Sequence, residues 1–397
     1  MQNQIYQDII CFSSAYWDEA LWTNKQHIMS RLSKSHRVLY IEPGIFSKRY
    51  FTQNTLRRPL RWFKWLRREN ENLWIYSPLI LFYRGSPWLR DIGWRILLSF
   101  VRRFVSKQHF QSPLLWIYQP EAVRSVGELA ANLVLYDCVD EISNFPYYLK
   151  NIQHQQSVLK DENSLLSKAD LVVTTAQTLY EAKRHKNPNT HLVHNVADVE
   201  HFSTALCTET IIPADIACLK GPRIGFIGAV SEYKVNFELI KHISQVHPEW
   251  HIVLIGPVGE GDLQTQVTIL HGLPNVHLLG HRPYAVLPAY IKGFDVCIIP
   301  YNLNEYTAGV FPMKFFEFLG TGKPVVSTKL PSLQGYEFIA AFADNNQKFV
   351  ALIESALQND NDAEKARRIE IAQQNSWDQR IGKIMELVTQ IQERKQK

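Results

Sequence analysis

Cysteine is scarce in this chain of 397 residues, and no two cysteines have the C-x-x-C spacing typical of metal or redox sites. Three of the five, Cys11, Cys138 and Cys297, lie in apolar runs, the pattern of reduced core residues in a reducing compartment. The N-terminus lacks a basic segment followed by a long apolar stretch, so we expect no cleaved signal peptide. The longest uncharged apolar-rich run, residues 73–83, is too short to span a bilayer. We therefore expect a cytoplasmic protein, peripheral on the inner face of the cell membrane.

Internal repeats and low-complexity segments are also missing, and the composition is that of a folded protein. Hydrophobic residues make up 46% of the chain, aromatic residues 12% and charged residues 20%, which argues against intrinsic disorder. A chain of this length can bury two cores, so we expect two or three domains. The formal net charge of +5 is small, and its meaning depends on where the basic residues lie.

Apolar strands alternate with helical patterns along the chain, which is typical of α/β architecture. Several strands are continuous apolar runs, as expected where helices cover both faces of a sheet. We predict an N-terminal domain at 1–205, a linker at 206–221, a C-terminal domain at 222–375 and a terminal helix at 376–397. The predicted strands are 9–13, 38–41, 73–76, 114–118, 133–137, 171–174 and 191–194 in the first domain, and 223–228, 251–256, 276–279, 296–300 and 325–328 in the second.

The most informative segment is 294–328, which reads as a strand, a loop, a helix beginning near Pro312 and a second strand. Such a unit places loop N–H groups and a helix N-terminus at the carboxyl edge of a parallel sheet, where anionic ligands bind. Lys314 and Glu317 share one face of this helix. The lysine suits a phosphate and the carboxylate suits ribose hydroxyls, which favours a nucleotide-sugar enzyme. The alternative is ordinary helix punctuation with a solvated ion pair.

Residues 312–327 read PMKFFEFLGTGKPVVS. This pattern resembles the donor-site segment of the retaining GT-B glycosyltransferases of the family 4 type. The resemblance implies two doubly wound Rossmann-like domains facing a cleft, with the C-terminal helix crossing back onto the first domain. It also implies that Glu317 holds the donor ribose. The family's other glutamate, eight residues earlier, is Gly309 here, so that carboxylate is missing or displaced, with Glu305 as a candidate.

The resemblance extends to a loop of the second domain that carries an arginine and a lysine for the donor diphosphate in this family. Gly228 and Lys234 match that loop, whereas the arginine position is Ala229. Arg282 is a candidate for the missing cation, because the leaving group needs charge stabilisation. The alternative for Lys234 is an exposed surface lysine. The predicted donor-binding residues are Gly228, Lys234, Arg282, Thr307, Gly309, Lys314 and Glu317.

Acidic residues follow a buried strand of the first half, at the edge expected to face the cleft. The family often has a histidine near this point, and the chain has none between Phe110 and His154. We predict Asp137 and Asp140 as the catalytic residues in its place. The alternative is a helix N-terminus with acidic residues in its first turn.

An aromatic and acidic loop follows the first predicted strand. Tyr16 and Trp17 lie in it and are predicted to contact the acceptor, because an aromatic ring there can stack on a sugar. The alternative is that tryptophan packs in the domain core, which is its commoner position.

The clearest charge feature is the basic segment 56–68, with tryptophans among its basic residues. On a helix it would form an interfacial amphipathic surface attracted to anionic lipids. A second candidate is 88–107, and the alternative for both is a helix with a solvated basic face. Nucleic-acid binding is not expected, because no nucleic-acid motif accompanies the patch. The predicted membrane-contact residues are Arg57, Arg58, Arg61, Trp62, Lys64, Trp65 and Arg68.

Together these features predict a glycosyltransferase that moves a sugar from a UDP- or GDP-linked donor to an acceptor hydroxyl. The expected setting is cell-surface polysaccharide or glycolipid assembly, with a glycan or lipid-linked acceptor. The resemblance further implies retention of anomeric configuration and no metal or other cofactor. The alternatives are a non-catalytic GT-B protein that binds a glycan or acts as a scaffold, and a nucleotide-sugar epimerase.

Overall fold

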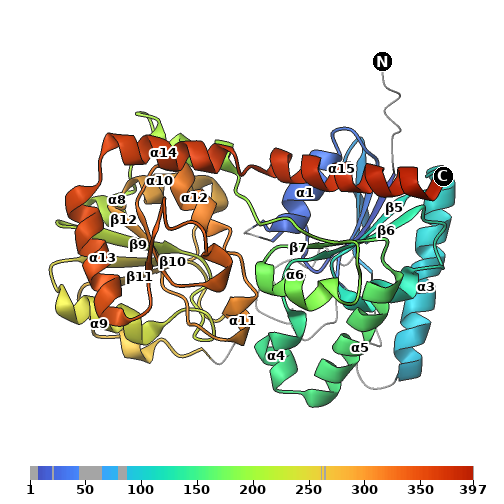
Figure 1. The fold of residues 1–397 in the computed structure, drawn as a ribbon, viewed down its shortest axis with the longest axis horizontal. Helices are drawn as coiled ribbons and strands as arrows, with labels where there is room; N and C mark the ends of the chain where they lie inside the picture. Colours follow the sequence, from blue (N-terminus) through green and yellow to red (C-terminus); the bar gives the residue numbers. More distant parts are fainter. Residues whose placement is uncertain are drawn as a thin grey trace.

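The computed structural model describes residues 8–19, 22–43, 65–78, 87–260, 262 and 265–396, which form two sheets placed side by side (Figure 1). The first sheet has the strand order β3-β4-β2-β1-β5-β6-β7-β8. All its neighbouring strands are parallel except β3 and β4. Its strands are β1 (Ile9–Phe12), β2 (Val38–Ile41), β3 (Leu66–Asn70), β4 (Leu73–Tyr76), β5 (Leu114–Ile117), β6 (Leu133–Cys138), β7 (Leu171–Thr174) and β8 (Thr190–Leu192).

The second sheet is wholly parallel, with the order β11-β10-β9-β12-β13-β14. The chain starts in the middle at β9, builds outward to β11, and then returns to β12 on the other side. The strand order therefore reverses between β9 and β12, and ligands bind at the carboxyl ends of strands at such a point. Its strands are β9 (Arg223–Ile227), β10 (His251–Ile255), β11 (Val276–Gly280), β12 (Val296–Ile299), β13 (Val325–Thr328) and β14 (Ala341–Ala343).

Helices connect the strands of both sheets and cover their faces (Figure 1). In the first half they are α1 (Asn24–Leu32), α3 (Pro87–Lys107), α4 (Pro146–Leu149), α5 (Ile152–Lys168) and α6 (Gln177–Arg184). From the junction onward they are α7 (Val199–Ser203), α8 (Ala214–Ala217), α9 (Phe237–Val246), α10 (Leu287–Lys292), α11 (Glu305–Ala308), α12 (Lys314–Gly320), α13 (Asn346–Asn359), α14 (Asp362–Gln373) and α15 (Trp377–Gln396). Across the described ranges no helix is both long and apolar enough to cross a membrane.

The predicted strands are confirmed, each within three residues of its predicted ends. They are continuous apolar runs because helices bury both faces of the sheet. Short 3₁₀ turns complete the connections: η3 (Pro120–Ser125), η4 (Ile142–Asn144), η5 (Thr204–Leu206), η6 (Thr268–Leu270), η7 (Tyr284–Val286) and η8 (Pro331–Leu333).

The basic segment was predicted to be a helix, and the structure corrects this at its C-terminal end. Arg68 lies in β3, which pairs with β4, and its guanidinium lies 5.4 Å from the ring of Trp74. Trp65 packs on Phe100 with ring centroids 5.0 Å apart. The remaining predicted membrane contacts, Arg57, Arg58, Arg61, Trp62 and Lys64, lie outside the described residues.

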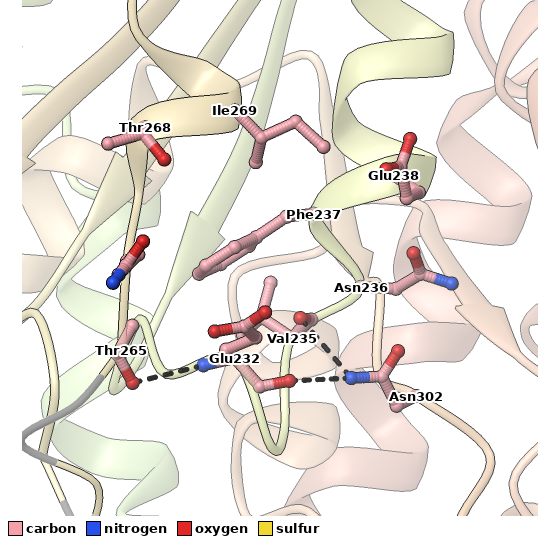
Figure 2. Close-up of a pocket in the computed structure, with 10 residues that line it drawn as sticks. Glu232, Val235, Asn236, Phe237, Glu238, Thr265, Thr268, Ile269 and Asn302 are labelled. Atoms are coloured by element: carbon pink, nitrogen blue, oxygen red, sulfur yellow. Dashed lines mark hydrogen bonds between the residues drawn. The ribbon is translucent and has the colours of Figure 1, made fainter.

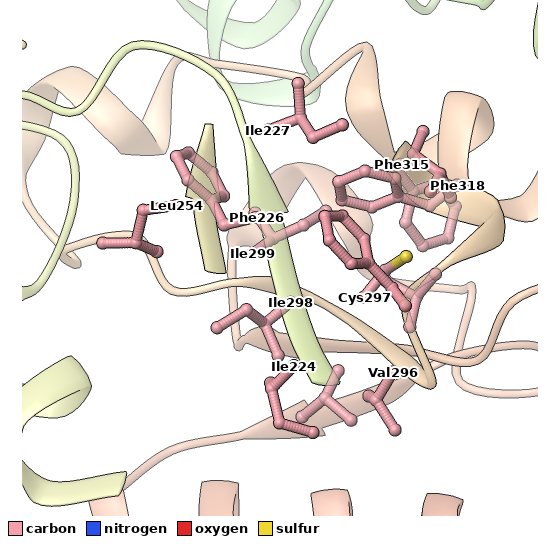
Figure 3. Packing of buried hydrophobic residues seen from close by; sticks show 14 of the residues in the cluster. Ile224, Phe226, Ile227, Leu254, Val296, Cys297, Ile298, Ile299, Phe315 and Phe318 are labelled. Atoms are coloured by element: carbon pink, nitrogen blue, oxygen red, sulfur yellow. The ribbon is translucent and has the colours of Figure 1, made fainter. Parts of the chain in front are cut away.

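The core of the second half holds β9, β12 and α12 together, as Figure 3 shows. Gly225 in β9 is required by this packing, because a Cβ atom there would lie 2.0 Å from the ring of Phe294. Phe315 and Phe318 from α12 are fully buried against the same strands. The core also includes Phe202 from α7, so packing with the second sheet begins before the predicted linker at 206.

The last helix, α15, packs on the first sheet, as the resemblance implied (Figure 1). Trp377, Ile384, Val388 and Ile391 lie in one buried cluster with β1, β2 and β5. The ring of Trp377 stacks on His27 of α1, with centroids 5.0 Å apart. The first domain is therefore completed by residues from the other end of the chain.

Candidate functional site

The site forms where β9 and β12 end, at the reversal of strand order in the second sheet. Gly228 follows β9 with a φ of +153°, a conformation that favours glycine. The side chain of Lys314 passes directly over it: a Cβ atom at Gly228 would lie 2.7 Å from Cε and 3.0 Å from Nζ of that lysine. Gly228 therefore leaves the space in which the ammonium group of Lys314 lies at the end of β9.

A second lysine, Lys234, lies on the loop after β9. Its carbonyl accepts a hydrogen bond from the N–H of Asn302 at 2.9 Å, which ties the loop to the residues after β12. Its Nζ lies 5.2 Å from the ring centroid of Tyr301, and Nζ of Lys314 lies 5.7 Å from the same centroid. Both cations therefore flank one ring at the carboxyl edge of the sheet.

The outer side of the Lys234 loop borders a pocket of about 900 Å³, shown in Figure 2. Asn302 donates from Nδ2 to the carbonyl of Glu232 at 2.8 Å, and the N–H of Glu232 donates to Oγ1 of Thr265 at 3.3 Å. Asn302 and Thr265 thus hold the loop from two sides (Figure 2). The lining residues of this pocket are Glu232, Val235, Asn236, Phe237, Glu238, Thr265, Gln266, Thr268, Ile269 and Asn302.

Lys234 keeps its charge although it is half-buried. Burial alone would lower its pKa, but the phenol groups of Tyr301, Tyr306 and Tyr233 and the carboxylate of Asp140 hold the pKa well above its ordinary value. An ammonium ion with few water contacts is a strong site for an anion.

Glu317 lies one helical turn after Lys314 on α12, in a half-buried position. Burial raises its pKa to about 7; the charge of Lys314 opposes this rise and that of Asp198 adds to it. The same carboxylate and Asp198 contribute to the raised pKa of Tyr284, after burial itself. Glu317 therefore sits beside the junction between the halves, close enough to the lysine pair to bind the same ligand.

Several contacts join the two halves around the site. The rings of Phe145 and Tyr306 lie 5.1 Å apart, and Oγ1 of Thr178 donates to the carbonyl of Ala308 at 2.8 Å. A Cβ atom at Gly309 would lie 3.6 Å from Cβ of Glu141. The loop with Gly309 therefore lies against the first half, and Asp140 interacts electrostatically with Lys234 across the boundary.

Asp137 was predicted to face the cleft, but its side chain lies in the interior of the first half. Its side chain is fully buried, Oδ1 accepts from Nη2 of Arg380 in α15 at 3.1 Å, and Oδ2 accepts from Nε1 of Trp116 at 3.3 Å. Arg380 also donates to the carbonyls of Val193 and His194. Asp137 thus anchors α15 and presents no surface to a substrate, while Asp140, three residues later, is partly exposed.

Two other predicted donor residues have structural partners. Arg282 donates to the hydroxyl of Tyr290 at 2.7 Å and to Oδ2 of Asp215 at 3.0 Å, which fastens it to α8 and α10. Thr307 is fully buried, and its hydroxyl donates to the carbonyl of Asn302 and completes the cap of α11.

On the predicted acceptor side, Tyr16 and Trp17 are 6% and 4% exposed. The ring of Trp17 packs edge-on against Tyr40 at 5.1 Å, and the backbone N–H of Trp17 donates to Oε1 of Glu42 at 2.8 Å. This is the core packing named as the alternative, and neither ring offers a free face for a sugar.

The prediction missed the aromatic surroundings of the lysine pair. Tyr301 lies in the loop after β12 and Tyr306 lies in α11. Tyr233 lies beside Lys234, with its ring 5.0 Å from that of Tyr306. The sequence feature that could have predicted Tyr301 is its position directly after the apolar run that ends at Pro300. This position lies at the edge of the sheet where ligands bind.

The chain is similar to known proteins in sequence and in fold. The family model described as glycosyl transferases group 1 matches residues 221–359. A relative, the putative teichuronic acid biosynthesis glycosyltransferase TuaH of Bacillus subtilis, is 31% identical over 272 residues, which are 64% of this chain and 66% of that protein. The match thus spans less than two thirds of each protein.

Solved structures share the arrangement of both halves. The structure of HepE from Anabaena in complex with UDP superposes with a TM-score of 0.67 at 16% identity, covering 97% of this chain and 100% of that one. The E. coli trehalose-6-phosphate structure bound with UDP-2-fluoro glucose gives 0.69 at 11% identity, covering 97% and 99%. Sucrose-phosphate synthase from Thermosynechococcus elongatus gives 0.68 at 14% identity, covering 97% and 99%. These likenesses establish the fold.

The two facing Rossmann-like halves and the returning helix define a GT-B protein. Within this fold, the second sheet matches the family model for group 1 glycosyl transferases, and the chain is similar in sequence to TuaH.

Proposed function

We propose that the protein transfers a sugar from a nucleoside-diphosphate sugar, UDP-linked in the first instance, to an acceptor hydroxyl. The observation that carries this proposal is the convergence of Lys234, Lys314 and Glu317 at the ends of β9 and β12. The lysine pair supplies two positive charges for a diphosphate, and the carboxylate suits ribose hydroxyls. The complexes of HepE with UDP and UDP-glucose support the choice of a UDP-linked donor.

In the proposed reaction the acceptor oxygen bonds to the anomeric carbon, and the bond from that carbon to the diphosphate oxygen breaks. The proton of the acceptor hydroxyl passes to an oxygen of the leaving diphosphate. The diphosphate gains negative charge as it leaves, and Lys234 and Lys314 stabilise that charge in a site with little water. Asp140, which faces Lys234 from the first half, is the proposed catalytic carboxylate of that half. The lysine pair takes the part of a metal, so we propose no metal or other cofactor. Retention of configuration is proposed from the family resemblance.

The proposed acceptor is a glycan or lipid-linked glycan of a cell-surface polysaccharide, which is supported by the name of TuaH. A membrane-bound acceptor also agrees with the exposed face of α3. Trp88 and Ile96 are each 62% exposed there, and Arg95 and Arg103 are exposed on the same side of the helix. We propose that this face contacts anionic lipids from the cytoplasmic side.

A thermal-shift screen tests the donor site. UDP, GDP, ADP and their common sugar conjugates are added to the protein, first without metal and then with magnesium. A ligand at a hundredfold excess over its dissociation constant adds about 2.7 kcal/mol of stability. We expect a shift with UDP and UDP-sugars without metal, and its loss in Glu317→Ala.

The matched control is Glu386→Ala, which removes an exposed glutamate on α15 and is expected to keep the full shift. A wild-type protein that shifts with none of these nucleotides would contradict the proposal and favour a non-catalytic scaffold. A shift that appears only with magnesium would contradict the metal-free arrangement.

A further inference from the structure

Tyr301 is the first residue after Pro300 at the end of β12, and its side chain is 1% exposed. Its hydroxyl oxygen is buried and, within the part of the chain that the structure describes, makes no hydrogen bond of ordinary geometry. Buried hydroxyl groups are normally paired, because an unpaired one loses its water without compensation. This hydroxyl therefore needs an explanation that folding alone does not give.

The surroundings of the hydroxyl are the two lysines of the site. Nζ of Lys234 and Nζ of Lys314 lie 5.2 Å and 5.7 Å from the centroid of the Tyr301 ring. Although burial would raise the pKa of the phenol, the charges of Lys234 and Lys314 lower it below its ordinary value. The oxygen thus lies in the positive field of both ammonium groups.

The backbone fixes the ring in this position. Tyr301 forms an antiparallel bridge with Val235, which is the residue directly after Lys234. The N–H of Asn236 donates to the carbonyl of Pro300 at 2.8 Å. The ring of Phe226 from β9 lies 6.2 Å away, edge to face. The loop of Lys234, the end of β12 and the end of β9 are therefore fastened around the phenol.

Two ammonium ions in one partly dry site repel each other until an anion arrives. A phenol oxygen between them offers lone pairs to both and lessens that repulsion. It also limits the directions in which the two flexible lysine side chains can point, which lowers the entropy lost on binding.

We propose that Tyr301 is a positioning residue that holds Lys234 and Lys314 as a pair directed at a diphosphate. The inference rests on the proposed function, because it assigns the lysine pair to the diphosphate of a nucleotide. Tyr301 acts through the lysines, so its removal weakens binding of phosphate groups and leaves contacts to the nucleoside unchanged.

The test compares Tyr301→Phe with the wild type in titrations with UDP, uridine and inorganic pyrophosphate. We expect the dissociation constants of UDP and pyrophosphate to rise roughly fivefold or more, because the two lysine side chains then lose more conformational freedom on binding, while that of uridine is unchanged. The control is Tyr118→Phe, which removes another buried, unpaired hydroxyl, 1% exposed and beside Lys25, in the first half.

A double-variant cycle adds a second readout. If Tyr301 acts through the lysines, Tyr301→Phe has no further effect on UDP affinity in a Lys234→Met and Lys314→Met background. Melting temperatures are measured for every variant. If Tyr301→Phe lowers the melting temperature and weakens binding of both uridine and UDP, the role of Tyr301 is structural only, and the inference is overturned. Unchanged UDP and pyrophosphate affinity in Tyr301→Phe would overturn it and leave the proposed function intact. Failure of the wild type to bind UDP, GDP or pyrophosphate would overturn both.

Discussion

At the scale of single residues, the site sets a half-buried carboxylate against a nearby ammonium ion. Lys314 and Glu317 lie one turn apart, yet burial still raises the pKa of Glu317 to about 7. The ligand-free site thus holds its carboxyl group in a costly position, as expected for a group placed for binding and not for stability.

This carboxyl group makes stability depend on pH. Between its unfolded pKa of 4.5 and about 7, the folded protein holds a proton that the unfolded chain has released, so stability falls as pH rises through this window. The full effect is up to about 3 kcal/mol. We expect Glu317→Gln to be more stable than the wild type at pH 8, with a smaller advantage at pH 5, in urea denaturation of the ligand-free protein.

The exposed Glu386→Gln serves as the comparison, for which the difference from wild type is expected to be the same at both pH values. A pH-independent difference for Glu317→Gln would show that this carboxylate is well solvated. Tighter nucleotide binding by Glu317→Gln would argue against its role at the ribose.

Some site residues could be predicted from the sequence and others could not. Lys234 and Lys314 were accessible to prediction, because Lys234 lies on the loop that follows β9 and Lys314 begins the helix between β12 and β13. Tyr16, Trp17 and Asp137 were not. Their burial depends on partners such as Glu42 and Arg380, which are distant in the sequence.

At the scale of secondary-structure elements, the buried ion pair between β6 and α15 decides whether the last helix is held. Arg380 and Asp137 are both fully buried, so removing one leaves the other charged without compensation. We expect Arg380→Met to destabilise the protein by about 3–5 kcal/mol. The double variant with Asp137→Asn should be less destabilised than Arg380→Met alone.

Unfolding in urea, followed by tryptophan fluorescence, measures these differences. Asp137→Asn is expected to bind UDP as the wild type does, because Asp137 has no exposed surface. If Asp137→Asn has normal stability but no longer transfers the sugar, Asp137 is a catalytic residue after all.

Strands were easier to predict than the element at 66–70. Continuous apolar runs have one stable location, the middle of a sheet covered on both sides. The residues of β3, Leu66 to Asn70, are largely polar and charged, and their strand conformation comes from pairing with β4 at the sheet edge. A basic segment with tryptophans matches a helical pattern equally well until its neighbour is known.

At the scale of the whole molecule, the outer face of the first half bears the proposed membrane surface. We expect Trp88→Ser with Ile96→Ser to weaken binding to vesicles of mixed anionic and neutral lipid, because both side chains are largely exposed and suit the interface. Arg95→Gln with Arg103→Gln should weaken binding by about 2 kcal/mol. Sedimentation with vesicles measures both.

Ile211→Ser is the control, since Ile211 is 82% exposed near the junction of the halves. If all variants bind vesicles equally well, α3 is not the surface that contacts the membrane. Equal binding to purely neutral vesicles by the wild type would contradict an electrostatic contribution.

The position of α15 also has a consequence for the order in which the protein is made. The strands of the first sheet leave the ribosome early, but Trp377, Ile384, Val388 and Ile391 of their core emerge after the whole second sheet. The second half, contiguous in the sequence, can fold while the first still waits for its last helix. The domain synthesised first is then the one completed last, and a nascent chain stalled before residue 377 would expose an apolar surface to chaperones.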